Sequence, residues 1–129
     1  MLRIITMAIL MTVTTPPALP ICPDSPNCVS SQAVDDHAIA PLLYTGDPRT
    51  AFERLRTLLM QRSDVKIISA DESSVNVEFR TLLGFVDDGL FLLDSTNSRI
   101  HIRSASRSGY WDLGKNRSRI EDIRKAFEQ

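Results

Sequence analysis

The chain has 129 residues, of which 43% are hydrophobic and 24% are charged, values typical of one globular domain built around one core. Its 15 basic and 16 acidic residues give a net charge of −1, so no whole-protein field favours a polyanionic partner. The charge is uneven, because the stretch from Arg99 to Arg119 holds six basic residues and one acidic residue, Asp112.

Residues 1–21 have the pattern of a targeting segment. Arg3 precedes an apolar run that ends before three prolines, and no charged residue follows until Asp24. The run is too short to cross a bilayer, which takes about 20 apolar residues. We therefore expect an export signal and a periplasmic or membrane-associated protein of a bacterium. A short uncleaved anchor, lipidation at Cys22 and a misassigned start codon are the alternatives.

Two cysteines follow this segment in the stretch CPDSPNCVSSQ, where Cys22 and Cys28 are separated by five residues rich in turn formers. In an oxidising compartment two cysteines without a competitor pair most simply with each other, so export favours a disulfide. The spacing matches neither the C-x₂-C of zinc sites nor the C-x-x-C of redox motifs, although metal binding and redox chemistry stay as alternatives. Residues 30–46 show no sustained hydrophobic period, and residues 22–46 are expected to form an extended arm.

Residues 47–129 are expected to form an α+β domain. Asp47 is a candidate N-cap for a helix that starts at Pro48 and reaches about Gln61. Short β-branched and alternating runs predict four strands in two hairpins, at 65–68, 75–79, 90–93 and 99–106. Ser118 and Glu121 have the spacing of a capping box at the start of a C-terminal helix. The order predicts a four-stranded antiparallel sheet with one helix before it and one after it.

The chain resembles the family known as domain of unknown function 1499 (DUF1499). The resemblance runs from Cys22 to the last helix and rests on CPDSPNCVSSQ, on APL at 40–42, on GFVDD at 84–88, on RSASRSG at 103–109 and on DLGKNR at 112–117. It implies a shared fold, often behind an export or membrane-targeting segment, without an assigned reaction. It also implies that the cysteines, the Asp-Asp pair and the Arg-Ser-Ala-Ser-Arg run belong to one arrangement. The chain departs from the family at Gly89-Leu90, where an acidic role is in doubt.

The residues expected to form a site come from the basic stretch and from the segment before Gly89. With a period of two, Ile100 and Ile102 face the core, whereas the opposite face of the same strand collects three arginines and a histidine. Candidate ligand-binding residues are His101, Arg103, Arg107, Asn116, Arg117, Asp87 and Asp88. Arginines can bind a carboxylate or phosphate with two parallel hydrogen bonds. The structural alternative is that the two aspartates already neutralise those arginines.

Two function classes follow from these candidates. The first is a non-catalytic binding module for an anionic small molecule, a lipid head group or an envelope protein. The second is a small hydrolase-like enzyme that uses His101 with Asp87 or Asp88. We expect no cofactor, no metal site and no nucleic-acid partner, because the basic stretch carries only two aromatic residues for stacking. The first class is favoured, since no recognised catalytic motif is present.

Overall fold

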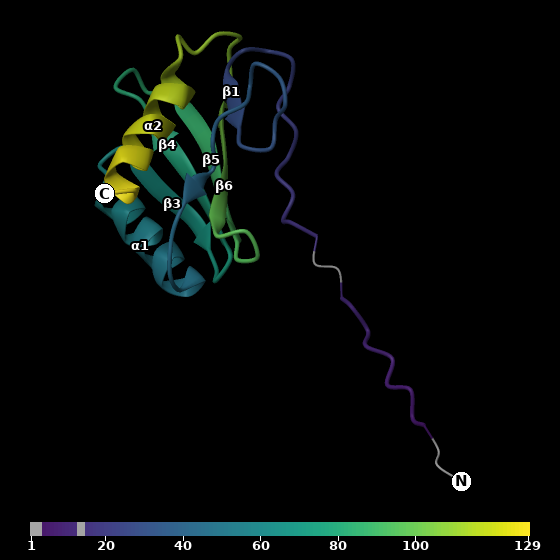
Figure 1. The fold of residues 1–129 in the computed structure, drawn as a ribbon. Helices are drawn as coiled ribbons and strands as arrows, with labels where there is room; N and C mark the ends of the chain where they lie inside the picture. Colours follow the sequence, from purple (N-terminus) through teal and green to yellow (C-terminus); the bar gives the residue numbers. More distant parts are fainter. Residues whose placement is uncertain (1–3, 13–14) are drawn as a thin grey trace.

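Two helices cover one face of an antiparallel sheet in the computed structural model, which describes residues 4–12 and 15–129 (Figure 1). The elements in chain order are β1 (Cys28–Ser30), β2 (Leu42–Leu43), α1 (Pro48–Gln61), β3 (Val65–Ala70), β4 (Ser74–Arg80), β5 (Val86–Asp94), β6 (Arg99–Ser106) and α2 (Lys115–Phe127). The strands lie in the order β1-β6-β5-β4-β3, and β2 also pairs with β6. The expected α+β class, with its antiparallel sheet and two flanking helices, is confirmed.

The sheet has six strands instead of the expected four. The two additional strands, β1 and β2, come from the segment 22–46, and both pair with β6 in antiparallel register. They have three and two residues, which is too short for a period of two to be seen in the sequence. The segment is therefore more than an extended arm, because it completes one edge of the sheet.

Strand β5 begins at Val86, four residues before the predicted start. Asp87 and Asp88 therefore lie inside a strand, opposite Ser106 and Ala105 of β6, and not in a connecting loop. A strand that has neighbours on both sides is held by ladder hydrogen bonds from β4 and β6. These bonds maintain the strand through two adjacent acidic residues that local propensity disfavours.

The start of α1 agrees with the prediction from the sequence, whereas the start of α2 differs from its prediction. The Asp47 carboxylate accepts a hydrogen bond of 2.8 Å from the Thr50 amide, as an N-cap does. Helix α2 starts at Lys115, so Ser118 lies within its first turn and the predicted capping box with Glu121 is wrong. Asp112 performs the capping instead, because its carboxylate accepts from the amides of Gly114 and Asn116.

The core lies between the helices and the inner face of the sheet. Ile100 and Ile102 point into it as predicted, and both are fully buried. Other large buried side chains include Ile39, Leu42 and Tyr44 around β2, Phe52, Leu55 and Leu59 of α1, Val75, Val77, Phe79 and Phe91 of the sheet, and Ile120, Ile123 and Phe127 of α2. Burial of these side chains is the main stabilising contribution to the fold.

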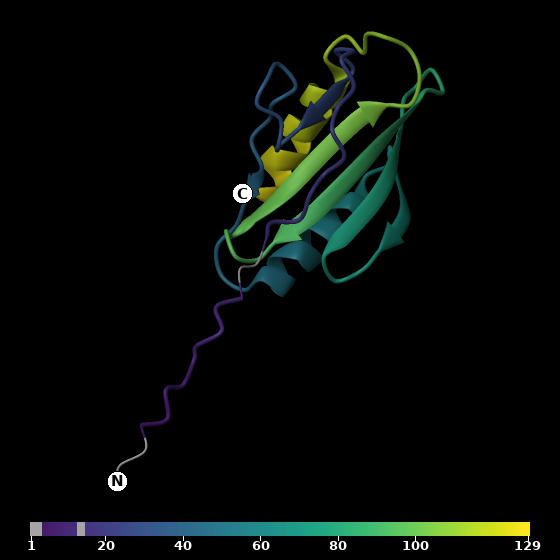
Figure 2. The same cartoon turned by 90° about the vertical axis from the view of Figure 1, so that its right-hand side faces the viewer.

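The outer face of the sheet is covered by the segment that leads to Cys22. Figure 2 shows this purple segment crossing in front of β5 and β6, on the side away from the helices. Leu19 is buried there, with only 8% of its surface exposed. Gln32 holds the crossing segment at two points, because its side chain accepts from the Leu19 amide and donates to the Pro17 carbonyl. The face that the sequence suggested as an open arginine surface is thus partly closed.

Candidate ligand-binding groove

The predicted arginine site is dispersed over the molecule. Arg103 lies on the covered face of β6, where it is half-buried, and its Nε has no hydrogen-bond partner among the described residues. Burial lowers the pKa of Arg103, although the charge of Asp88 acts in the opposite direction. Arg117 lies on α2 and donates to the carbonyls of Ala38 and Asp36. Arg117 therefore fixes the segment between β1 and β2 and does not share a concavity with Arg103.

Arg107 lies at the end of β6 and is occupied by carboxylates. Its guanidinium is 2.6 Å from Asp88 and 2.7 Å from Glu78. The hydrogen bonds that Arg107 donates to Asp88 and then to Glu78 raise the pKa of Arg107 above its ordinary value. The same contact with Arg107 lowers the pKa of Glu78. This arrangement matches the structural alternative, in which an aspartate of the pair neutralises an arginine.

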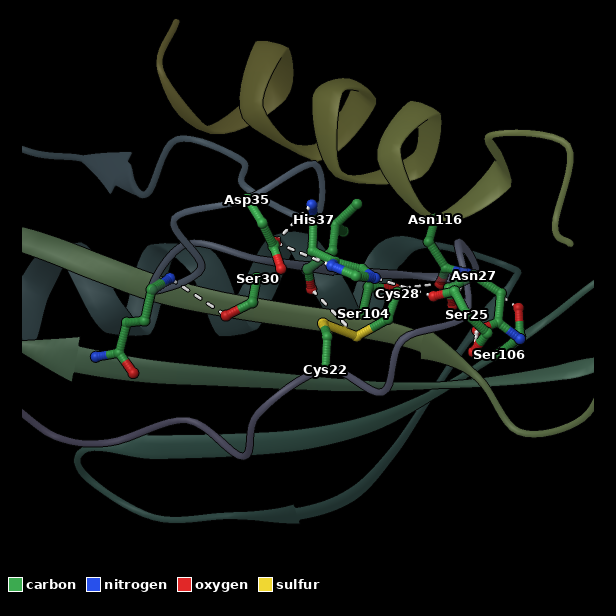
Figure 3. Close-up of a disulfide and its surroundings, with 12 residues drawn as sticks. Cys22, Ser25, Asn27, Cys28, Ser30, Asp35, His37, Ser104, Ser106 and Asn116 are labelled. Atoms are coloured by element: carbon green, nitrogen blue, oxygen red, sulfur yellow. Dashed lines mark hydrogen bonds and ion pairs between the residues drawn. A yellow bond between two sulfur atoms is a disulfide. The ribbon is translucent and has the colours of Figure 1, made fainter. Parts of the chain in front are cut away.

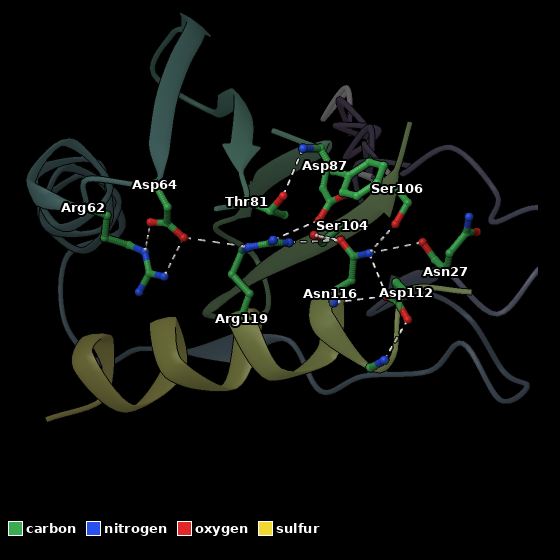
Figure 4. A network of polar contacts seen from close by, with 12 residues as sticks. Asn27, Arg62, Asp64, Thr81, Asp87, Ser104, Ser106, Asp112, Asn116 and Arg119 are labelled. Atoms are coloured by element: carbon green, nitrogen blue, oxygen red, sulfur yellow. Dashed lines mark hydrogen bonds and ion pairs between the residues drawn. The ribbon is translucent and has the colours of Figure 1, made fainter. Parts of the chain in front are cut away.

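Asp87 binds an arginine that the sequence argument missed. Its carboxylate lies 2.8 Å from Arg119 of α2, and both side chains are buried (Figure 4). The Arg119 guanidinium also stacks over the Phe79 ring, 4.6 Å from its centroid. A sequence signal existed, because Arg119 lies three residues after Asn116 and four before Ile123. That spacing places it on the buried face of the helix.

Asn116 is the centre of a buried polar network that joins four segments (Figure 4). Its side chain binds Ser104 and Ser106 of β6, Asp112 before α2, and the Asn27 carbonyl in the cysteine loop. Asn27 in turn donates to the Gly109 carbonyl at 2.7 Å. The network fixes the 107–114 connection against the sheet, so Asn116 has a positioning role and is buried away from solvent.

Cys22 and Cys28 form the predicted disulfide, with their Cα atoms 5.8 Å apart (Figure 3). The bond links the crossing segment to β1. Next to it, the two ring nitrogens of His37 face two acceptors, the Ser25 carbonyl at 3.0 Å and the Asp35 carboxylate at 2.9 Å. These hydrogen bonds raise the pKa of His37, with the Ser25 carbonyl making the largest contribution. The contact between His37 and the Ser25 carbonyl therefore ties the loop between the two cysteines to the segment that follows β1.

His101 is buried and pairs with a carboxylate other than the two expected. Its Nε2 lies 3.1 Å from Asp94, and its Nδ1 lies 3.3 Å from the Ser31 hydroxyl. Burial raises the pKa of Asp94, but hydrogen bonds from Asn97 and His101 outweigh it and leave the pKa below its ordinary value. The expected partnership of His101 with Asp87 or Asp88 is not formed.

A concavity with apolar walls lies at the end of the sheet where β4 turns into β5. It has a volume of about 460 Å³ and lies between residues 81–87 and residues 106–115. We call it the apolar groove. Its large apolar wall residues are Leu82, Leu83, Phe85, Val86, Trp111 and Leu113. Five of them, all except Val86, are between 58% and 106% exposed. So many exposed large apolar side chains around one concavity are typical of a binding site.

The polar groups of the apolar groove are few and mostly satisfied. Asp87 is paired with Arg119, and Asp112 caps α2. Lys115 also lines the groove, and its ammonium forms no ion pair within the described part of the chain. The groove therefore offers an apolar surface with one available positive charge at its rim.

A family model covers nearly the whole of this structure. The model described as "Protein of unknown function (DUF1499)" matches residues 18–127. The chain belongs to the DUF1499 family. The matched range begins one residue before the buried Leu19 and ends with α2, so the DUF1499 domain includes the segment that crosses the sheet. No curated protein and no solved structure shows significant similarity to the chain. Among the described residues, no helix of this DUF1499 protein is long and apolar enough to cross a membrane.

The resemblance implied that the cysteines, the Asp-Asp pair and the Arg-Ser-Ala-Ser-Arg run form one arrangement, and the DUF1499 fold brings them together. Cys28 lies opposite Ala105, and Asp88 lies opposite the same residue on the other side of β6. The three motifs thus occupy adjacent strands at the end of the sheet that carries the apolar groove. From the sequence, residues 84–86 are part of a family motif only, and nothing connects them with Trp111 and Leu113.

Proposed function

We propose that this DUF1499 protein is an exported, non-catalytic binding module for a small anionic amphiphile. The observation that carries the proposal is the apolar groove, in which two loops present large exposed apolar side chains around a cavity of about 460 Å³. A concavity of this size is in the range of small-molecule sites, which favours a small ligand over the envelope protein considered from the sequence. Lys115 at the rim supplies the charge that an anionic group would contact.

The construction of the groove also supports binding without rearrangement. The contacts of Asn27, Asp112 and Asn116 fix the wall formed by residues 106–115. Asp87, which lines the groove, is fixed by its pair with Arg119. A preorganised site avoids part of the entropic cost of association. The disulfide and the apolar run after Arg3 support export, because disulfides persist mainly in oxidising compartments.

Trp111 allows a direct test, since it is the chain's single tryptophan and lines the groove. The probe is dodecanoate, titrated below its micelle-forming concentration against the disulfide-bonded protein. We expect a saturable shift of Trp111 emission to shorter wavelength, and a weaker affinity in Leu83→Ser. The matched control is Ile68→Ser, which changes an exposed apolar side chain of β3 outside the groove. An unchanged emission spectrum at every dodecanoate concentration would overturn the proposal.

The hydrolase alternative has one observation in its favour. Ser31, His101 and Asp94 are connected in the order hydroxyl, imidazole and carboxylate, which is the order of a catalytic triad. However, the Ser31 oxygen already accepts from the Ile102 amide at 2.8 Å, and His101 is only 6% exposed. Labelling by a fluorophosphonate probe that disappears in Ser31→Ala would support hydrolysis. Absence of labelling would leave these residues a structural link between β1 and β6.

A further inference from the structure

A second concavity adjoins the apolar groove and is lined by charged side chains. It has a volume of about 450 Å³ and lies between the end of α1, the end of β4 and the first turns of α2. We call it the basic cavity. It shares Thr81, Leu82 and Lys115 with the apolar groove. The two concavities are therefore adjacent, separated by these three residues.

The lining of the basic cavity is positive. Four cations, Arg62, Arg80, Lys115 and Arg119, line it together with two carboxylates, Asp64 and Asp122. Because Asp87, outside the lining, neutralises Arg119, the excess is one positive charge. Arg62 and Arg119 are held by carboxylates, Arg62 through two bonds of 3.0 Å to Asp64 and Arg119 through Asp87. Arg80 is exposed and shares Glu78 with Arg107. Arg80 and Lys115 are thus the cations most available to a ligand.

We propose that the basic cavity binds the phosphate head of the amphiphile whose apolar chain occupies the apolar groove. This inference rests on the proposed function and adds the chemical class of the head group. A phosphate carries up to two negative charges and several acceptor oxygens, which match the two available cations, Arg80 and Lys115. The arginine fork, the Lys115 ammonium and the hydroxyls of Ser63 and Ser118 provide donors of different geometry. A carboxylate would use fewer of them.

The two parts of the ligand can be tested separately with dodecyl phosphate, dodecanoate and inorganic phosphate, each followed by Trp111 emission and by the ³¹P NMR signal where phosphorus is present. We expect dodecyl phosphate to bind about tenfold or more tightly than dodecanoate, because additional charge-assisted hydrogen bonds form. Lys115→Gln should weaken both amphiphiles, because Lys115 lines both concavities. Arg80→Gln should weaken only dodecyl phosphate, because Arg80 lines the basic cavity alone.

The matched control is Lys66→Gln. Lys66 is an exposed cation whose charge also acts on Glu78, but it lines neither concavity. Equal affinities for dodecyl phosphate and dodecanoate would overturn the phosphate inference and leave the proposed function intact. If neither amphiphile shifts Trp111, both fail. If inorganic phosphate binds as tightly as dodecyl phosphate, the proposal that the ligand is an amphiphile is overturned, because the apolar chain would then contribute nothing to the affinity.

Discussion

The Asp87 carboxylate and the Arg119 guanidinium form a buried ion pair of 2.8 Å that joins β5 to α2. Asp87 lines the apolar groove and Arg119 lines the basic cavity, so one contact supports both concavities. A buried charge that loses its partner is costly, whereas an exposed one is hydrated. The adjacent residue, Asp88, provides the comparison, because its pair with Arg107 is about half exposed.

Replacing Asp87 by Ala should lower the free energy of unfolding by about 3 kcal/mol or more, because the buried Arg119 would keep only a contact of 3.9 Å with Asp64, which already binds Arg62. Asp88→Ala should cost less than about 1 kcal/mol. Urea denaturation of both variants measures the difference. Similar small losses in the two variants would show that the Asp87–Arg119 pair does not stabilise the fold.

Removing the disulfide should destabilise the protein by about 2 kcal/mol, because the loop it closes is short. The variant is Cys22→Ser with Cys28→Ser, compared with the oxidised protein by urea denaturation. Thiol labelling of the denatured, unreduced protein should detect no free thiol, since both cysteines are bonded. Two labelled thiols, or an unchanged unfolding curve in the double variant, would contradict this expectation.

His37 should make stability depend on pH near neutrality. Both ring nitrogens face acceptors, and the resulting pKa is raised in the folded state. A raised folded pKa gives a stabilising contribution that is complete below the unfolded value of about 6.5 and is lost as pH rises through the folded value. NMR titration should therefore find the His37 pKa above about 6.5. In His37→Gln the loss of stability between about pH 6 and pH 8 should be smaller than in the wild type.

Leu113 should be replaceable with a gain in stability and a loss of binding. Its φ of 56° lies in the left-handed region, which is unfavourable for leucine and is tolerated by asparagine. Leu113→Asn should raise the free energy of unfolding by about 1 kcal/mol or less, and it should weaken dodecanoate binding because an apolar wall residue is removed. Leu82→Asn is the control, since Leu82 is exposed in the same groove without a positive φ. It should weaken binding without the gain in stability.

Local sequence patterns predicted the helices and strands that are long enough to show a hydrophobic periodicity. The α1 helix with its Asp47 cap and the two hairpins follow from such patterns. The strands β1 and β2 do not follow from local patterns, because they form by pairing with β6 and have no local sequence preference for a strand. The same limit applies to the site. The alternation in β6 correctly placed Arg103 opposite the core, but it could not show that the chain before Cys22 returns to cover that face.

The segment before Cys22 approaches the sheet from the end opposite the apolar groove. Figures 1 and 2 show the segment that precedes Cys22 reaching the domain near the end of the sheet where β5 joins β6, whereas residues 81–85 and 107–114 lie beyond the other end of the strands. Strand β5 has nine residues, which corresponds to roughly 30 Å at the usual rise per residue. Any attachment at the N-terminal end would therefore leave the groove at the end of the domain that is farther from the attachment. The groove would then lie about one strand length farther from the attachment than the near end of the sheet does.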